Sequence, residues 1–447
     1  MERSSSSVTS DRCRRHVVLL PYPGRGHIHP LLRLAHRLAS CGFVTTVVLT
    51  QEWLSLLSAS SPPLPPSVCF RSIPNVVPSE RARGADLGSF IRAVLVDMGP
   101  PVAALLAELD PPPAVLVADS MLPWAPAIAR RMDVPIAAFF PQAATIFLAL
   151  QQLKALSPLE IERSISGNGS NYLDYVPRPT SSHLDDFITH SNGEGMLKAF
   201  IEGISWFATA RCILFNTFNE LETRALHALR SFVAVPFYSI GPLVADIVTE
   251  QTTKWYFSWL DSHLPRSVLY VSLSSFLPFT NEELKEIAIG LQMSGHPFLW
   301  SVPDSKDIEE LIGQKGIVVP WCNQAEVLCH PSIGGFLTHC GWNSTLEGIH
   351  AGVPMLTFPL MWDQFPNSKL IVEDWGVGFS LKDDDKGVVS REVIAIAVRR
   401  LMDLYSAGSK ELSKVMELKW KSHFASSTEV DFNNFIEKIT SQGSVES

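Results

Sequence analysis

Apolar and polar positions follow one repeated order along the chain. Short apolar runs, each bounded by Gly, Pro or Asp, are followed by stretches with helical periodicity. This order is typical of βαβ units, in which helices join parallel strands. In the first half of the chain the predicted elements are a strand at 17–20, a Gly/Pro loop at 22–28, a helix at 31–39, strands at 43–49 and 114–118, a helix at 124–132 and a strand at 134–140.

A second series of the same kind begins near residue 268. It follows a segment with Gly-Pro and Thr-Thr, so we place an interdomain linker at 242–255. We therefore predict two α/β domains, each with a doubly wound parallel sheet, in which ligands gather at the carboxyl ends of the strands. The Pro-rich segments 62–66 and 111–113 are predicted loops, because proline lacks a backbone donor. Strands of the second series are predicted at 268–272, 298–302, 316–319, 334–337, 355–358 and 378–380.

Composition narrows the class of protein. Hydrophobic residues make up 46% of the 447 and charged residues 18%, which predicts a large core and argues against disorder. The 36 Lys and Arg residues face 45 Asp and Glu residues, a net charge of -9. That balance argues against a nucleic-acid-binding surface, which needs clustered cations. We interpret the basic cluster of Arg12, Arg14 and Arg15 as a solvated tail.

Several features predict a cytoplasmic protein without a metal ion. The seven cysteines are scattered and odd in number, which favours a reducing compartment, and Cys322 and Cys329 lack a second pair at zinc-ligand spacing. The Ser-rich N-terminus lacks the apolar core of a signal peptide. The longest apolar stretch, 137–150, is broken by Pro141 and Gln142 and is too short to span a bilayer. We interpret this stretch as a buried strand that leads into a helix.

The first candidate site is the segment PYPGRGHIHP at 21–30, where the first strand meets the first helix. Its glycines, Gly24 and Gly26, allow a tight turn and a close approach to a ligand. His27 lies at or just before a helix N-terminus, whose dipole disfavours the imidazolium, so a neutral ring can accept a proton there. The alternatives are a structural histidine and a metal pair with His29, which lacks a third ligand. GxGxxG is not satisfied, because His29 stands at its last position.

The second candidate is Asp119, at the end of the apolar run VLVAD. An acid at the carboxyl end of a buried parallel strand lies at the ligand-binding edge of the sheet. Next to His27 it would accept the other ring N–H, fix the tautomer and stabilise the imidazolium formed on proton abstraction. The alternative is a carboxylate that caps the following helix. Ser120 could be a nucleophile, but its neighbours lack the G-x-S-x-G elbow.

The segment 321–364 carries the most specific pattern in the chain. It contains a predicted strand, a short loop and a helix that begins near Trp342. Backbone N–H groups, hydroxyls and the dipole of a helix N-terminus form an anion site, so a diphosphate fits there. Polar residues of the first helical turn are Asn343, Ser344 and Thr345.

Other side chains of this segment suit a nucleotide joined to a sugar. Glu347, one turn further on, can accept from two ribose hydroxyls, and Trp321 offers an aromatic face for a base. Asp363 and Gln364 supply an acceptor and a donor for a polyhydroxylated group. Helix capping or core packing explains each residue taken alone. The combination within one segment predicts a nucleotide-sugar site.

The segment 321–364 resembles the 44-residue signature of the plant secondary-product UDP-glycosyltransferases. The resemblance covers nearly the whole chain, through GHIHP, NTFNELE, SIGPL and SWLDS…SVLYVSL. It implies a GT-B fold, two Rossmann-like domains facing across a cleft, with the acceptor bound mainly by the first domain and the UDP-sugar by the second. The domains expected from it are 1–245, 246–430 and a C-terminal helix at 431–447 that packs on the first domain.

The resemblance also implies roles for individual residues. His27 would be the general base and Asp119 its charge-relay acid. Trp342 and Gln364 resemble the pattern associated with UDP-glucose as opposed to UDP-galactose. The implied donor contacts are Trp321, the Cys322 backbone and Gln324 around the uracil, Glu347 at the ribose, Ser275, His339, Asn343 and Ser344 at the diphosphate, and Trp342, Asp363 and Gln364 at the sugar. Asn323 and Gly341 are expected among the donor-binding residues as well.

The chain departs from the family pattern at several positions. Ser274-Ser275 replaces the usual Gly-Ser, so Ser275 can still bind a phosphate while the Cβ of Ser274 crowds the backbone. Asn323 stands where proline is common, and His29 where asparagine is common. Near the C-terminus, HFASSTEVDFNNF lacks the usual Gly-Gly-Ser. These differences bear on donor affinity and leave the implied catalytic groups in place.

The expected reaction is an inverting transfer of glucose from UDP-glucose to a hydroxyl or carboxyl of a small hydrophobic metabolite. We expect a monomer with no cofactor, no metal ion, no nucleic-acid partner and no stable membrane insertion. An apolar acceptor pocket near Asp119 is predicted, although core packing explains its members equally well. Its predicted lining is Met121, Trp124, Phe139, Phe140 and Phe147.

Two other classes of function remain alternatives. One is a non-catalytic UDP-sugar-binding protein, if Ser274 prevents a productive donor geometry. The other is a nicotinamide-dependent oxidoreductase with two Rossmann-like domains. The second alternative requires a complete GxGxxG before a helix with a suitable acid downstream, and we find none in the sequence.

Overall fold

The computed structural model describes residues 15–59, 67–80, 86–154, 201, 203–244, 254–273, 279–302, 308, 310–381 and 389–441. The predicted loop at 62–66, Ser274, Ser275 and most of the predicted linker at 242–255 lie outside these residues. The chain divides into two compact units. Among the described residues, the first unit holds those up to 154, from 201 to 243 and from 426 onward, and the second holds residue 244 and those from 254 to 425.

A seven-stranded sheet forms the centre of the first unit, and every neighbouring pair of strands is parallel. The strand order is β3-β2-β1-β4-β5-β6-β7. The order reverses between β1 and β4, so the carboxyl ends of these two strands are neighbours at the place where ligand sites form in such sheets. The strands are β1 (His16–Leu20), β2 (Val44–Thr50), β3 (Val68–Ile73), β4 (Val115–Asp119), β5 (Ile136–Phe140), β6 (Cys212–Phe215) and β7 (Phe237–Ser239).

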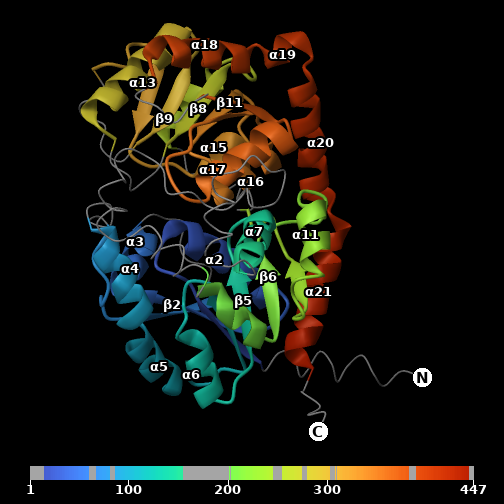
Figure 1. Cartoon of the computed structure of the whole chain (residues 1–447). Coiled ribbons are helices and arrows are strands. Elements are labelled where there is room, and N and C mark those ends of the chain that lie inside the picture. Colours follow the sequence, from blue (N-terminus) through green and yellow to red (C-terminus); the bar gives the residue numbers. More distant parts are fainter. Residues whose placement is uncertain are drawn as a thin grey trace. The chain divides into compact units, whose positions relative to one another are not determined.

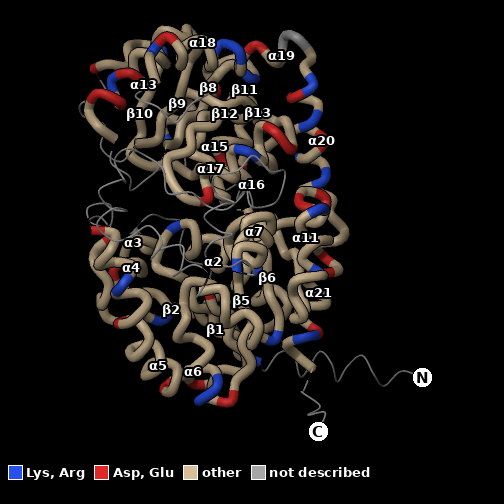
Figure 2. The backbone as a smooth tube through the Cα atoms, in the orientation of Figure 1, with Lys and Arg blue, Asp and Glu red and all other residues tan. Residues whose placement is uncertain are grey.

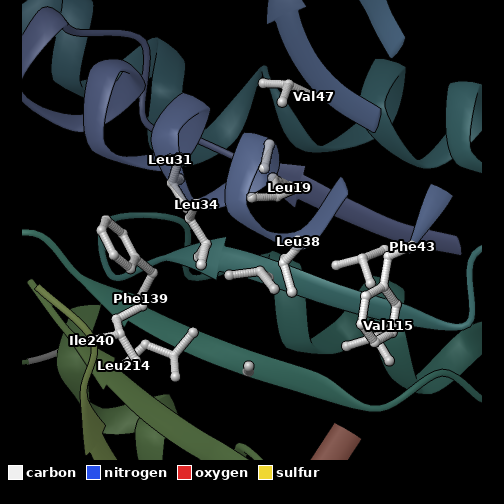
Figure 3. Packing of buried hydrophobic residues seen from close by; sticks show 14 of the residues in the cluster. Leu19, Leu31, Leu34, Leu38, Phe43, Val47, Val115, Phe139, Leu214 and Ile240 are labelled. Atoms are coloured by element: carbon white, nitrogen blue, oxygen red, sulfur yellow. The ribbon is translucent and has the colours of Figure 1, made fainter. Parts of the chain in front are cut away.

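Helices cover the sheet of the first unit (Figure 1). Helix α2 presents Leu31, Leu34 and Leu38 on one face, and all three are fully buried. Figure 3 shows these side chains directed at the strands, where Phe139 and Leu214 belong to the same cluster. The helices are α2 (Arg25–Ser40), α3 (Gln51–Ala59), α4 (Leu87–Val96), α5 (Gly99–Ala107), α6 (Ala125–Arg131), α7 (Ala144–Lys154), the 3-10 turn η3 (Trp206–Thr209), α11 (Thr223–Leu229) and α21 (Ser426–Thr440).

The second unit contains a six-stranded parallel sheet with the order β10-β9-β8-β11-β12-β13. Its order reverses between β8 and β11. The strands are β8 (Val268–Ser272), β9 (Phe298–Ser301), β10 (Gly316–Val319), β11 (Ile333–Thr338), β12 (Met355–Thr357) and β13 (Gly378–Ser380). The helices are α12 (Trp255–Asp261), α13 (Asn281–Ser294), α15 (Gln324–Leu328), α16 (Trp342–Ala351), α17 (Gln364–Lys369), the π-helical turn η4 (Leu370–Asp374), α18 (Arg391–Met402), α19 (Leu404–Ala407) and α20 (Lys410–Phe424).

Local chemistry explains where helices of the second unit begin and end. A capping box starts α13: Thr280 Oγ1 accepts from Glu283 N, and the Glu283 carboxylate accepts from Thr280 N. Gly295 then ends the helix with a left-handed φ of 83°, which glycine adopts at no steric cost. Charges of both signs alternate along α13, α18 and α20, whereas β8, β9 and β11 carry none (Figure 2). The charged faces thus lie on helices and the apolar runs in the sheet.

The observed strands agree closely with the apolar runs, with two kinds of difference. Strands β8, β10 and β13 have the predicted bounds, and in the apolar stretch 137–150 the strand β5 leads into α7 as predicted. The loop predicted at 22–28 is wrong, because α2 already begins at Arg25. Gly24 and Gly26 suggested a longer loop, but Gly24 is the N-cap residue and Gly26 lies in the first turn of α2, which continues past Pro30. The strands β3, β6 and β7 were not predicted, since each is short or alternates between buried and exposed residues.

The C-terminal helix α21 belongs to the first unit. Its buried face joins the core of that unit and contacts β7. The helix begins at Ser426, five residues before the predicted boundary at 431, because the chain turns at Ala425 between α20 and α21. Residues of α21 in the core are Phe432, Phe435, Ile436 and Ile439.

One described stretch, Leu87–Ala107, is long and apolar enough to cross a membrane by length and composition. It consists of two helices, α4 and α5, separated at Asp97 and Met98. Each helix buries one face in the protein, with Phe90 of α4 and Val102 of α5 among the buried residues. By length and composition alone the stretch is weak evidence for a membrane span.

Candidate active site

His27 and Asp119 meet at the switch point of the first sheet. Asp119 is the last residue of β4 and is fully buried, and His27 lies in the first turn of α2, just after β1. The distance from His27 Nδ1 to Asp119 Oδ2 is 2.7 Å. A buried carboxylate only accepts, so Nδ1 carries the proton and the lone pair of a neutral ring is on Nε2. This is the arrangement of a general base oriented by an acid.

Other contacts hold the two side chains in place. Asp119 Oδ1 accepts from Met121 N at 3.0 Å and from Ser120 Oγ at 3.4 Å, so both carboxylate oxygens have donors. The ring of Tyr22 lies 4.8 Å from the ring of His27, between centroids. The His27 side chain keeps 22% of its surface exposed. Its ring is thus fixed by Asp119 while remaining accessible to solvent or substrate.

The environment of His29 keeps its ring neutral. Burial, together with the charges of Arg33 and Arg25, lowers the pKa of His29 to about 3. Among the residues that the structure describes, no group of three or more His, Cys, Asp and Glu side chains could hold a metal ion.

The second candidate region lies at the switch point of the second sheet, after β11. Cys340 adopts a positive φ of 65°, and its N–H donates to Thr338 Oγ1 at 3.1 Å, which turns the chain into α16. Gly341 is the N-cap residue and has no side chain to cover the helix N-terminus. A Cβ on Gly341 would lie 2.6 Å from His339 Nε2. Glycine is therefore required for the His339 ring to sit against the start of α16.

His339 is a neutral ring in this environment. Its Nδ1 lies 3.3 Å from the carbonyl oxygen of Ser272, the last residue of β8. Burial lowers the pKa of His339 to about 4. At neutral pH the ring therefore carries no charge, and positive potential at this position comes from the N-terminus of α16.

A hydrogen-bond network joins three predicted donor residues. Gln324 Nε2 donates to Ser344 Oγ and to Glu347 Oε2, both at 2.8 Å. Ser344 and Glu347 lie on α16, one helical turn apart, and both are buried. Gln324 begins α15, after Asn323 at the N-cap position. The structure thus brings together a hydroxyl, a carboxylate and an amide beside the predicted anion site.

Trp321 and Cys322 have different environments although they are neighbours in sequence. The Trp321 side chain is 38% exposed, and Lys254 Nζ lies 4.8 Å from the centroid of its ring. Cys322 is buried, and burial raises the pKa of its thiol to about 11. An exposed indole can offer a face to a base, whereas the Cys322 side chain points into the protein. Lys254 at this position was not predicted from the sequence.

Asp363 and Gln364 lie at the start of α17. Gln364 Oε1 accepts from the backbone N–H groups of Leu360 and Met361, at 2.8 and 3.1 Å. Asp363 Oδ2 accepts from Asn367 Nδ2 at 3.1 Å, and the same nitrogen donates to the Cys340 carbonyl at 2.9 Å. Asn367, which was missed in the sequence, therefore links α17 to the turn before α16.

Trp342 is placed differently from the other residues of this region. It is 3% exposed, and its ring lies 6.2 Å from the ring of Trp375. The indole thus packs inside the second unit, so a contact with a sugar would involve its backbone. Asn343 lies beside it in the first turn of α16. Ser275 is outside the described residues.

The predicted acceptor pocket is not formed by all five of its proposed residues. Phe139 belongs to the core cluster beneath α2. Phe140 is the next residue of β5, on the other face of the sheet, where it packs edge to face with Phe147 and Phe215. Phe139, Phe140 and Phe147 are at most 1% exposed. In the structure these three are core residues, which is the alternative that the sequence left open.

Met121 and Trp124 follow Asp119 in the chain and have separate contacts. Met121 N donates to Asp119, as described above, and the Met121 side chain is 7% exposed. Trp124 Nε1 donates to the Val94 carbonyl at 2.9 Å, and its ring packs against Gly99. Trp124 thus holds α5 and α6 together.

Comparisons with known proteins identify the family of the chain. A family model described as UDP-glucoronosyl and UDP-glucosyl transferase matches residues 244–415. UDP-glycosyltransferase 87A2 from Arabidopsis thaliana is 38% identical over 95% of this chain and 97% of its own length. UDP-glycosyltransferase 87A1 from the same plant is 38% identical over 88% of this chain and 92% of its own. The chain belongs to the plant UDP-glycosyltransferase family.

This UDP-glycosyltransferase also resembles proteins of known structure in its fold. The crystal structure of Medicago truncatula UGT71G1 complexed with UDP-glucose has a TM-score of 0.79 and 27% identity, covering 97% of this chain and all of that one. Phytolacca americana UGT2, complexed with UDP-2-fluoro-glucose and pterostilbene, has a TM-score of 0.77 and 27% identity over 96% of this chain and all of its own. The fold is therefore GT-B, as predicted, and the chain is a glycosyltransferase. The oxidoreductase and the non-catalytic binding protein are excluded as alternatives.

Proposed function

We propose that this UDP-glycosyltransferase transfers glucose from UDP-glucose to a hydroxyl or carboxyl group of a small hydrophobic metabolite, with inversion at the anomeric carbon. The observation that supports it most is the 2.7 Å hydrogen bond from His27 to Asp119. This hydrogen bond leaves His27 Nε2 as the proton acceptor, on a ring that is partly exposed. A base of this kind suits an acceptor hydroxyl, which must lose a proton when it attacks.

In the proposed reaction His27 Nε2 takes the proton of the acceptor hydroxyl. The acceptor oxygen forms a bond to the anomeric carbon of glucose from one face, and the bond from that carbon to the diphosphate oxygen breaks on the other. The products are a β-glucoside and UDP. Asp119 stabilises the imidazolium that His27 becomes, through the Nδ1–H bond. Asp119 contributes to the rate because the positive charge on His27 develops only as the transition state forms.

The charge of the departing diphosphate is taken up by groups of the second unit. In the proposal these are the backbone N–H groups at the start of α16 and the hydroxyl of Ser344, with Gly341 allowing close approach. His339 contributes as a neutral ring, since its pKa is about 4. We propose that no metal ion or other cofactor takes part, because preorganised dipoles supply this stabilisation.

The proposed donor contacts follow the geometry of the second unit. Trp321 stacks on the uracil, and Glu347 accepts from the ribose hydroxyls while Gln324 holds one of its oxygens. Asp363 and Gln364 bind the sugar hydroxyls at the start of α17. Glucose is the proposed sugar on the basis of Trp342 and Gln364, whose pattern resembles that of glucose-specific members of the family.

Aromatic side chains next to His27 support a hydrophobic acceptor. The rings of Tyr22 and His27 lie 4.8 Å apart, and Phe90 packs edge to face on Tyr22 at 5.9 Å. An acceptor whose hydroxyl reached His27 Nε2 would place its apolar part near the Tyr22 ring.

We also propose a cytoplasmic monomer, in keeping with the free thiols of the cysteines that the structure describes.

A mass-spectrometric screen tests this function. The enzyme is incubated with UDP-glucose, UDP-galactose or UDP-glucuronic acid and a mixed library of phenols, alcohols and carboxylic acids. We expect hexosides to form with UDP-glucose at a rate well above those of the other two donors, and NMR to show β-anomers. A His27→Ala preparation made in parallel excludes products of a contaminating enzyme. Exclusive use of UDP-glucuronic acid, or α-anomeric products, would overturn the proposal.

A further inference from the structure

Tyr270 places a hydroxyl deep in the second unit. It lies in the middle of β8, is 1% exposed and stacks on Phe336 of the neighbouring strand β11, with centroids 5.2 Å apart. A buried phenol needs hydrogen-bond partners. Its oxygen lies 3.2 Å from Cys322 Sγ and 3.3 Å from Gln324 Oε1. Both partners belong to the segment that leads into α15, at the edge of the proposed donor site.

Gln324 Oε1 can only accept, so it takes the single proton of the Tyr270 hydroxyl, and the contact with Cys322 then runs from the thiol to the Tyr270 oxygen. Burial raises the pKa of Tyr270 well above its ordinary value and that of Cys322 to about 11, so both keep their protons. The thiol can then donate to the Tyr270 oxygen, while the Tyr270 hydroxyl donates to Gln324 Oε1. Hydrogen bonds that run in one direction polarise one another, so the series from Cys322 through Tyr270 to Gln324 strengthens each donor in it.

The amide of Gln324 is fixed at both ends. Its nitrogen uses both hydrogens, one on Ser344 Oγ and one on Glu347 Oε2. A carboxylate only accepts, so the nitrogen must face Glu347 and the oxygen must face a donor, which is the Tyr270 hydroxyl. Without that donor the amide loses the contact that opposes its rotation. The Glu347 carboxylate would then lose a well-oriented partner.

We propose that Tyr270 is a positioning residue for the donor ribose, because its hydroxyl orients the Gln324 amide that holds Glu347 Oε2. The inference rests on the proposed function, in which Glu347 accepts from the ribose hydroxyls. It extends the donor site to a strand outside the segment 321–364. Tyr270 itself touches neither substrate nor the reacting atoms.

The test compares two nucleotides that differ in one ribose hydroxyl. Dissociation constants of UDP and 2′-deoxy-UDP are measured by calorimetry for the full-length wild type and for Tyr270→Phe. We expect Tyr270→Phe to weaken UDP binding by about 3- to 10-fold, the effect of one hydrogen bond, and to weaken the binding of 2′-deoxy-UDP, which keeps only one of the two ribose hydroxyls, by a smaller factor. With UDP-glucose as donor, KM should rise by a similar factor while kcat stays near the wild-type value.

The ratio of the two affinities separates positioning from a general loss of stability. A merely structural role would weaken both nucleotides equally or lower only the melting temperature. Tyr405→Phe is the matched control, because Tyr405 lies at the start of α19 and its ring packs under Arg266. This variant should keep the wild-type ratio. The inference would be overturned if Tyr270→Phe had the wild-type ratio of affinities for UDP and 2′-deoxy-UDP while the wild type still bound UDP.

A second variant keeps the test decisive if Tyr270→Phe folds poorly. Gln324→Ala removes the amide through which Tyr270 acts, so Tyr270→Phe should change the ratio no further in that background. Additive losses in the double variant would contradict the inference. Failure of the wild type to bind either nucleotide would instead contradict the proposed donor site, so the two failures are distinguishable.

Discussion

His27 Nδ1 donates to Asp119 Oδ2 over 2.7 Å, across the switch point of the first sheet. The two residues are 92 positions apart, yet they follow β1 and β4, which are neighbouring parallel strands. The hydrogen bond selects one tautomer of His27, since the carboxylate requires a proton on Nδ1. That selection, more than the presence of a histidine, makes Nε2 a base.

Asp119→Asn should reverse the tautomer. The amide oxygen can still accept from Met121 N, which directs the amide NH2 group at His27 Nδ1 and makes Nδ1 an acceptor. Nε2 then carries the proton and cannot take another from the acceptor. We expect kcat for a weakly acidic alcohol to fall by about 100- to 10,000-fold with little change in UDP affinity. Steady-state kinetics and calorimetry check both parts, and a wild-type kcat would refute the role of Asp119.

Gly341→Ala should disturb the ring of His339. The new Cβ would lie 2.6 Å from Nε2, so the ring must move away from the start of α16 and from the Ser272 carbonyl. We expect UDP to bind about 5- to 10-fold more weakly, in line with the cost of a displaced side chain. Calorimetric titration with UDP measures the change. Unaltered affinity would show that the His339 ring does not contact the diphosphate.

Burial of His16 should make the first unit sensitive to acid. Nδ1 donates to the Pro111 carbonyl at 2.6 Å, so Nε2 is free of a proton and accepts from Thr46 Oγ1 at 2.8 Å. The pKa of His16 is lowered, first by desolvation and then by the charge of Arg71, although the bond to Pro111 opposes this. The stabilisation from a neutral His16 is complete above the unfolded-state pKa of about 6.5. It is lost as the pH falls from there towards the lower folded-state pKa.

The measurement for His16 is the melting temperature at pH 7.5 and at pH 5.0. His16→Gln keeps a donor and an acceptor but has no group that titrates in this range. We therefore expect the variant to lose less stability on acidification than the wild type does, although it starts from a lower value. Equal losses for both proteins would mean that His16 is not responsible for the pH dependence.

Phe435→Ala should weaken the attachment of α21 to the first unit. Phe435 is fully buried in the core cluster, so truncation leaves a cavity and costs about 3–5 kcal/mol of unfolding free energy. Val430→Ala on the same helix is the control, because Val430 is 57% exposed and should cost less than about 0.5 kcal/mol. Chemical denaturation measures both. Similar values for the two variants would contradict the packing of α21.

Much of the fold could be predicted from apolar runs, for a physical reason. Central strands such as β8 and β11 are covered on both faces, so their residues are almost all apolar and stand out between helices. His27 and Asp119 could be paired because acids and bases after parallel strands share one edge of the sheet. The edge strand β3 alternates between buried and exposed residues and gave a weaker signal.

Contacts that depend on strand order and side-chain direction could not be predicted. Tyr270 reaches Gln324 across 54 residues because β8 lies beside β11, and nothing in either segment indicates this pairing. Phe139 and Phe140 looked alike in the sequence, yet consecutive residues of a strand point to opposite faces. Asn367 gave no signal of its own, because its role comes from the turn at Cys340.

The most direct test of the account is the rate of glucose transfer to a weakly acidic alcohol by His27→Ala. His36→Ala is the matched control, since His36 is an exposed histidine of the same helix. We expect kcat/KM of His27→Ala to fall by at least about 100-fold, with UDP affinity unchanged, while His36→Ala stays near the wild-type value. A more acidic phenol should recover part of the lost rate. Full transfer to the alcohol by His27→Ala would contradict a mechanism in which His27 is the general base.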